Sequence, residues 1–149
     1  MFRAASGPPL TIVSGADRAL SGMQTQVQRV NQVGDDPYGT KTVNNWFNAA
    51  AFASPALGTY GTSRRNAYFG MGTRVVDLSL VRQFEIGGSR RIEARVEAFN
   101  AFNWFRPQTP NGNPSTNQSP VTNLSSASFG RYLVTDDPRI MQFALKYQF

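Results

Sequence analysis

The C-terminal segment constrains the fold of this chain more than any other part of the sequence. Counting back from the last residue, every second side chain is large and apolar, and the residues between them are polar or small. Because successive side chains of a strand point to opposite faces, this alternation predicts a β-strand with one apolar and one polar face. The apolar positions are Met141, Phe143, Leu145, Tyr147 and Phe149.

Residues 73–86 and 90–102 show the same alternation, and the glycine-bearing turn Gly87-Gly88-Ser89 joins them. Such a turn favours an antiparallel hairpin, and a three-residue loop would pair Ile86 with Arg90. This register places apolar side chains opposite apolar ones, whereas a one-residue slip would mix the two kinds. The predicted apolar face comprises Val76, Leu78, Leu80, Phe84, Ile92, Ala94, Val96 and Ala98, and the polar face comprises Asp77, Ser79, Gln83, Glu85, Arg91, Glu93, Arg95 and Glu97.

The apolar face could lie in the core of a soluble sandwich or against membrane lipid, and strand length distinguishes these two environments. Strands of roughly 10 to 13 residues match the tilted strands that cross a bilayer, whereas globular strands average about five or six residues. The mean hydropathy of −0.36 is that of a soluble protein, but alternating faces cancel in such an average. Arg82 interrupts the apolar face near the turn, where its long side chain can reach an interface. The pattern therefore predicts an apolar face against lipid and a polar face lining a lumen. The terminal strand resembles the signal that the outer-membrane assembly machinery recognises, and an ordinary amphipathic edge strand is the alternative.

The connections between the predicted strands are unequal in length. Residues 14–72 and 104–138 are long and rich in Asn, Gly, Ser, Thr and Pro, unlike the turn at Gly87. Outer-membrane barrels have short periplasmic turns and long extracellular loops. We therefore predict an all-β chain, an antiparallel transmembrane β-barrel segment of about four C-terminal strands, and no separate domain boundary. Residues 1–72 hold a partial strand (Leu10–Val13) and a long loop, 73–103 the transmembrane hairpin, 104–138 a long loop, and 139–149 the closing strand.

The composition excludes several kinds of chemistry. The chain has no cysteine and no histidine, which removes disulfides, the usual zinc sites and every histidine-dependent triad. Asp35-Asp36 and Asp136-Asp137 adjoin prolines, where aspartates more often cap turns than bind metals. We therefore predict no catalytic residue, no metal ligand, no cofactor and no enzymatic activity.

The net charge is +6, but the basic residues are scattered apart from Arg64-Arg65 and Arg90-Arg91. This distribution favours a solvated surface or anionic lipid headgroups over nucleic acid. The rival interpretation is a soluble all-β carbohydrate-binding module that uses aromatic loops. Its candidate residues are Trp46, Phe47, Trp104 and Phe105, for which loop packing or an interfacial aromatic girdle is the alternative role.

From Trp46 onward, several segments together resemble the C-terminal barrel end of TonB-dependent receptors, especially the Oar-like type with a carboxypeptidase-regulatory-like N-terminal domain. The resemblance implies a plugged barrel of roughly 22 strands that imports a bulky nutrient. It implies as partners outer-membrane lipid and lipopolysaccharide, the barrel-assembly machinery, the remainder of the barrel and plug, and TonB through an N-terminal part. The segments are residues 46–52, 70–80, 97–103, 129–131, 137–139 and 142–146.

The plug, the TonB box and most of the strands of this family are absent from the sequence. Even the smallest single-chain barrels need about eight strands, and an open sheet in lipid exposes unpaired backbone groups. We therefore expect an incomplete barrel, a C-terminal fragment that does not transport alone. Its expected location is the cell outer membrane, with a signal peptide upstream of Met1.

Overall fold

The computed structural model describes residues 1–22, 28–108 and 120–149. These residues form two compact units. The strand unit comprises Met1–Ala5, Thr73–Arg106 and Asp136–Phe149, and the loop unit comprises Ser6–Gly72 and Pro107–Thr135. The sequence predicts no such boundary, because each unit is assembled from segments that are distant in the chain.

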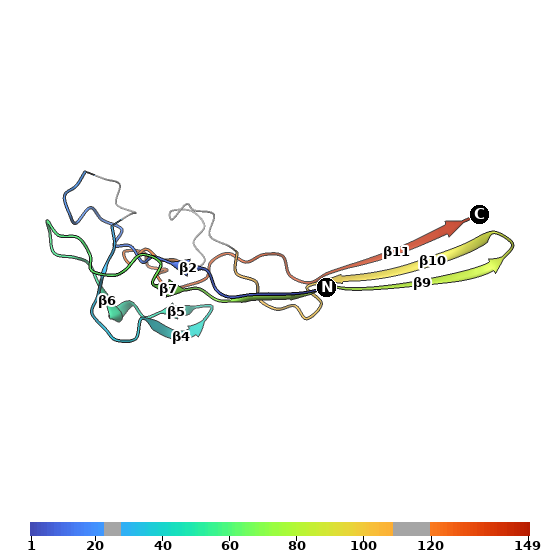
Figure 1. The fold of residues 1–149 in the computed structure, drawn as a ribbon, viewed down its shortest axis with the longest axis horizontal. Coiled ribbons are helices and arrows are strands. Elements are labelled where there is room, and N and C mark those ends of the chain that lie inside the picture. Colours follow the sequence, from blue (N-terminus) through green and yellow to red (C-terminus); the bar gives the residue numbers. More distant parts are fainter. Residues whose placement is uncertain (23–27, 109–119) are drawn as a thin grey trace. The chain divides into compact units, whose positions relative to one another are not determined.

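Three long antiparallel strands dominate the strand unit (Figure 1). They are β9 (Leu78–Gly87), β10 (Arg90–Phe99) and β11 (Ile140–Gln148), with β10 in the centre. The outer edges of β9 and β11 have no partner strand along these ranges among the described residues. The predicted all-β class and the incomplete sheet are therefore confirmed.

The register of the β9–β10 hairpin is the predicted one from Arg91, opposite Glu85, to Ala98, opposite Leu78. The prediction was wrong at the turn: Arg90 pairs with Gly87, and the register shifts at this point, leaving Ile86 unpaired. Gly87 and Gly88 have φ of 103° and 64°. Glycine adopts positive φ without steric cost, so this pair supports a two-residue turn followed by a β-bulge.

Ahead of the hairpin in the chain, β1 (Phe2–Ala5) pairs with β8 (Thr73–Val76). The sequence analysis placed the N-terminal partial strand at Leu10–Val13 instead of at β1. The Asp77 N–H donates to Met1 O (2.8 Å), and Val76 O accepts from the Ala101 N–H (2.8 Å). Consecutive strand residues direct their backbone groups to opposite sides. Met1, just before β1, and Ala101, just after β10, therefore lie on opposite sides of the segment that contains β8 and β9.

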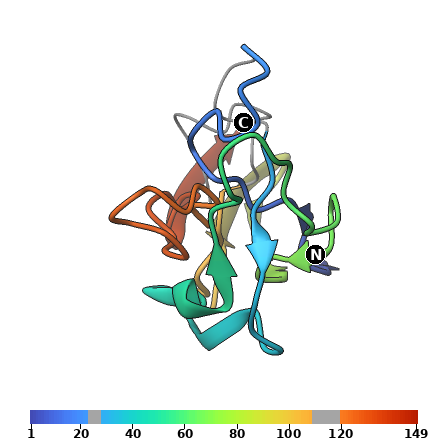
Figure 2. The same cartoon turned by 90° about the vertical axis from the view of Figure 1, so that its left-hand side faces the viewer.

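The long connections of the chain form the loop unit, which Figure 2 views from its own side. Three short two-stranded sheets pair segments of this unit. A 3-10 helix, Ala49–Ala51, is capped by the Asn48 side chain, which accepts from Ala50 N–H (3.1 Å). The pairs are β2 (Pro9–Leu10) with β7 (Tyr68–Phe69), β3 (Asn31–Gln32) with β6 (Phe52–Ala53), and β4 (Tyr38–Thr42) with β5 (Asn45–Phe47).

An aromatic core holds the loop unit together. Phe47 stacks on Tyr38 with ring centroids 5.7 Å apart, and Phe52 meets Tyr68 edge-on at 5.3 Å. Such ring pairs contribute about 0.5–1.5 kcal/mol beyond the area that they bury. The connections are therefore a packed structure. The buried cluster comprises Leu10, Ile12, Val30, Phe47, Ala51, Phe52 and Tyr68.

Within the described ranges, no helix is both long enough and apolar enough to cross a membrane.

Candidate functional site

The three-stranded sheet has one face made almost entirely of apolar side chains. The pairing aligns them in rows across the strands: Leu80 lies opposite Val96, and Val96 lies opposite Phe143. The side chains of the outer strands are open, with Leu145 at 75%, Leu80 at 70% and Phe143 at 69% exposure. The face comprises Leu78, Leu80, Phe84, Ile92, Ala94, Val96, Ala98, Met141, Phe143, Leu145 and Tyr147.

This face is unstable in water. Burying a single leucine or phenylalanine side chain stabilises a structure by about 1.5–3 kcal/mol relative to leaving it exposed. Soluble monomers rarely expose a large contiguous apolar patch, and those that do use it for binding. Each of the strands β9, β10 and β11 contributes to this face, so the sheet requires an apolar surrounding along its whole length.

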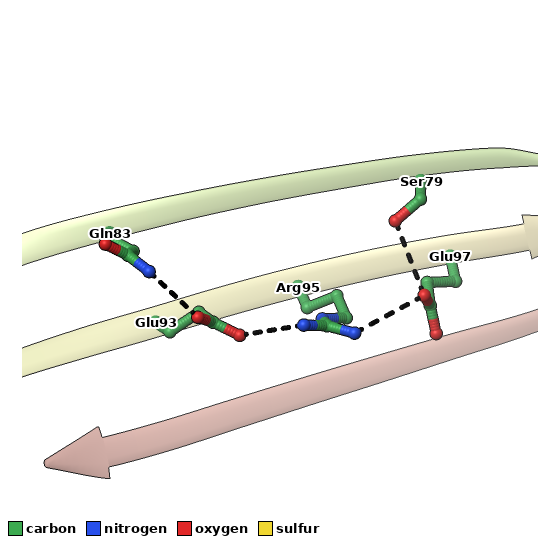
Figure 3. A network of polar contacts seen from close by, with 5 residues as sticks. All are labelled: Ser79, Gln83, Glu93, Arg95 and Glu97. Carbon is green, nitrogen blue, oxygen red and sulfur yellow. Dashed lines mark hydrogen bonds and ion pairs between the residues drawn. The ribbon is translucent and has the colours of Figure 1, made fainter.

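The opposite face carries a connected polar network, drawn in Figure 3. Arg95 lies between two glutamates, with its guanidinium 3.1 Å from Glu93 and 3.8 Å from Glu97. Gln83 donates to Glu93 (3.0 Å), and the Ser79 hydroxyl donates to Glu97 (3.4 Å). The Arg95 side chain is 44% exposed. The face is therefore hydrated, and its ion pairs are worth about 0–1 kcal/mol each.

Most of the predicted face residues lie where the alternation places them, with two exceptions. Asp77 lies between β8 and β9 rather than in a long strand, and its carboxylate accepts from the Asn100 N–H (3.0 Å). Val76 belongs to β8 and is partly buried, and its neighbour Val75, which the strand alternation places on the opposite face, is buried. The simple division into two faces therefore applies to β9, β10 and β11 and ends at Asp77.

Aromatic pairs lie at both ends of the sheet. Phe102 and Trp104 follow the end of β10 and stack with centroids 5.1 Å apart. Tyr147 and Phe149, at the end of β11, stack at 6.0 Å. Tyr147 lies opposite Ile92, close to the hairpin turn, so the two pairs are separated by the length of the strands. Aromatic residues at both boundaries of an apolar band are typical of membrane-spanning sheets.

The family comparison agrees with this geometry. Residues 1–142 match the model of a family described as an outer membrane beta barrel domain. The chain belongs to this family. No curated protein and no solved structure matches the chain. The protein is therefore an outer-membrane β-barrel protein, located in the outer membrane.

The sequence analysis did not predict the structural role of Asn100 in this barrel domain. Asn100 is 2% exposed, takes φ of 49°, and holds the chain reversal after β10. Its side chain donates to Trp104 O (3.0 Å) and accepts from the Trp104 N–H (3.1 Å). Asparagine tolerates positive φ better than most residues. An asparagine at the end of an alternating segment could therefore have indicated the chain reversal.

The candidate loop residues pack within their unit. Trp46 donates from Nε1 to Phe69 O (2.9 Å) and meets the Tyr132 ring edge-on at 5.6 Å, and Phe47 is 2% exposed. The predicted loop packing is therefore confirmed for Trp46 and Phe47. Trp104 is 39% exposed and Phe105 is 37% exposed.

Ionisable groups of the loop unit have structural partners. Burial raises the pKa of the Tyr132 hydroxyl to about 12 although it accepts from the Met71 N–H. Desolvation opposes ionisation of Asp17, but hydrogen bonds from Ser21, Gly22 and Gln28 outweigh it and lower the pKa of this carboxyl. In the described ranges, no three of the metal-ligating side chains gather into a group that could hold a metal ion.

The other aspartates of the sequence analysis lie in turns and ion pairs. Asp36 accepts from the Tyr38 N–H (3.0 Å), which is the predicted turn cap. Asp136 forms an ion pair with Arg106 (3.2 Å).

Proposed function

We propose that this chain forms the C-terminal strands of a TonB-dependent receptor in the outer membrane. The observation that carries the proposal is the sheet β11-β10-β9, in which an exposed apolar face is backed by a continuous ion-paired polar face. In the membrane, the apolar face contacts the lipid chains and lipopolysaccharide, and the polar face lines the lumen. Between the faces, the paired strands satisfy their backbone groups, as a membrane interior requires.

Two features support a large, receptor-type barrel over a small one. In barrels of about eight strands, side chains fill the interior, whereas larger barrels hold water or a plug. Arg95 and its two glutamates are charged and partly open to solvent, which suits a wide lumen. The connections from β1 to β8 and from β10 to β11 form a packed unit with its own core, and such substantial loops suit the capture of a bulky nutrient. The sequence resemblance supplies the TonB class.

The edge of β11 that has no partner strand among the described residues is the proposed contact with the barrel-assembly machinery. An unpaired edge strand accepts a further strand through its backbone groups, while alternate side chains give specificity. Met141, Phe143, Leu145, Tyr147 and Phe149 supply those side chains. The remainder of the barrel then occupies the outer edges of the sheet, the plug occupies the lumen, and TonB binds through an N-terminal part.

The proposed orientation puts the loop unit outside the cell and the turn between β9 and β10 in the periplasm, as in barrels with long extracellular loops and short periplasmic turns. It is testable because the chain has no cysteine. Leu57→Cys places a thiol at a 63% exposed site of the loop unit, and Ser89→Cys places one at the hairpin turn. A membrane-impermeant maleimide should label the first variant in intact cells and the second only after the outer membrane is permeabilised. Equal labelling of both variants in intact cells would exclude this orientation.

The receptor class requires a separate experiment. In-cell crosslinking of the outer-membrane product that contains this chain, followed by immunoblotting, should recover TonB. A heat-modifiable outer-membrane product that never crosslinks to TonB, with a known receptor as the positive control, would refute the receptor class and leave the barrel assignment intact.

A further inference from the structure

The apolar face of the sheet contains two arginines near the hairpin turn. Arg82 lies opposite Ala94, in a row that continues to Leu145. Arg90 lies at the start of β10, two positions from Ile92, and therefore on the same face. Both side chains are exposed. A charge directed at lipid chains is unfavourable, so the position of these two arginines calls for a ligand or an interface.

The Arg82 side chain extends toward the turn. Its guanidinium carbon lies 5.8 Å from the centre of the Phe84 ring, and Phe84 is two residues nearer the turn. The small side chain of Ala94 leaves room beside it. Long basic side chains reach polar groups at a membrane boundary in this way, and the stacked pair Tyr147–Phe149 marks the same end.

The charges of this corner are not balanced by carboxylates. Among the described residues, the ion pairs join Arg95 to Glu93 and Glu97, and Arg106 to Asp136, so neither Arg82 nor Arg90 has a carboxylate partner. Glu85 and Glu93 lie on the other face by the strand alternation. The lipid-side corner is therefore purely cationic.

The spacing of the two arginines suits one phosphate group. Arg82 and Arg90 are separated by about four strand positions along the sheet, or about 13 Å at about 3.3 Å per residue. Two extended arginine side chains are together long enough to span most of this distance. Guanidinium groups bind phosphate oxygens in a planar, bidentate manner.

We propose that Arg82 and Arg90 form a binding site for the phosphate headgroup of an anionic phospholipid in the membrane leaflet on the turn side. The site rests on the proposed function, because it requires the apolar face to contact lipid. It goes further by assigning a lipid class and a leaflet. Phosphatidylglycerol fits the site because its single phosphate carries the negative charge and its acyl chains lie along the apolar face.

The test measures lipid selectivity by electron paramagnetic resonance. The outer-membrane product that contains this chain is purified in detergent and reconstituted into phosphatidylcholine vesicles with a trace of spin-labelled phosphatidylglycerol or phosphatidylcholine. The motionally restricted fraction of each label gives its relative association with the protein. We expect preference for phosphatidylglycerol, falling about fivefold with each of Arg82→Gln and Arg90→Gln, as for a basic residue near an anionic surface.

Arg91→Gln is the matched control, because Arg91 follows Arg90 directly and lies on the polar face opposite Glu85. It removes the same charge and should leave the preference unchanged. An equal loss in Arg91→Gln, or no preference in the unaltered protein, would overturn the lipid site. Competition by sodium phosphate beyond that of sodium chloride at equal ionic strength would also overturn it, because the site would then bind free phosphate.

The two proposals fail differently. If neither label shows a restricted fraction, the apolar face does not contact lipid. Both the proposed membrane-spanning role of the sheet and the lipid site are then refuted. A restricted fraction that is equal for both labels leaves the barrel in the membrane and refutes only the lipid site.

Discussion

The substitution Phe143→Lys tests whether the apolar face lies against lipid. Phe143 is in the central row of the sheet, opposite Val96, and is 69% exposed. Its neighbour Gln142 lies opposite Glu97 on the polar face. Phe143→Lys and Gln142→Lys therefore introduce the same side chain one residue apart and differ in the face that carries it.

The two environments predict different energies. A lysine on the lipid face of a barrel near the middle of the bilayer costs about 2–4 kcal/mol, so a value of about 3 kcal/mol lowers the ratio of folded to unfolded protein about 100-fold. An exposed substitution in water changes stability by about 0.5 kcal/mol or less. Gln142→Lys belongs to this second class, since it places a positive charge beside Glu97 in a hydrated lumen.

Urea unfolding in lipid vesicles measures the difference, with the heat-modifiable electrophoretic band reporting the folded barrel. We expect Phe143→Lys to unfold at much lower urea concentration than Gln142→Lys. If the two variants differ by less than about 0.5 kcal/mol, which is the range of a surface change, Phe143 does not face lipid and the orientation of the sheet is wrong.

Three other predictions concern separate parts of the chain. Phe149→Ala should reduce the amount of assembled barrel severalfold with little change in its urea midpoint, because Phe149 is 95% exposed; quantitative immunoblotting of outer membranes checks this, and an equal loss in Gln148→Ala would contradict it. Arg95→Ala should cost only about 0.5–1 kcal/mol, since its ion pairs are partly exposed, and a loss above 2 kcal/mol in the same urea assay would mean that the wall is dry. The pKa of Tyr132 is raised to about 12 in the folded protein. Its contribution to the free energy of unfolding is therefore complete below the unfolded pKa of about 10 and is lost as the pH rises from about 10 to 12. Melting temperatures of Tyr132→Phe measured across this pH range should lack this decline, and a matching decline in the variant would refute the raised pKa.

The local pattern predicted the sheet because the strands β9 and β10 are adjacent in sequence and alternate along most of their length, with Val81 and Arg82 as the interruption in β9. Their shared register from Arg91 to Ala98 follows from matching apolar to apolar residues. The pairing of β1 with β8 was not predictable in this way, since Phe2 and Val76 are distant in sequence and β1 is short. The loop core was hidden for a similar reason: Phe47, Phe52 and Tyr68 meet across segments that show no periodicity. Burial created by distant contacts leaves little mark on local sequence.

The β-bulge at Ile86 has a physical cause that the sequence alone did not reveal. A two-residue turn pairs Gly87 with Arg90, and an unbroken ladder from that pair would next oppose Ile86 to Arg91 and Glu85 to Ile92. Most later pairs, such as Phe84 with Glu93 and Leu80 with Glu97, would then combine an apolar residue with a polar one, so one strand would direct its charged side chains toward lipid. Each such arginine costs about 2–4 kcal/mol at mid-membrane, and each glutamate costs less. Leaving Ile86 unpaired restores the pairing of Glu85 with Arg91 and costs one interruption of the ladder.

Two single-residue deletions test this reasoning. Deleting Ile86 removes the unpaired residue and leaves Gly87 opposite Arg90 and Glu85 opposite Arg91, so the folded amount in outer membranes should stay close to that of the unaltered protein. Deleting Val81, in the middle of β9, leaves the turn intact but moves Leu80 and Leu78 to the charged face. We expect this second variant to be absent from the heat-modifiable band. Equal folding of the two variants would show that the division into faces does not set the register, because only the Val81 deletion disturbs it.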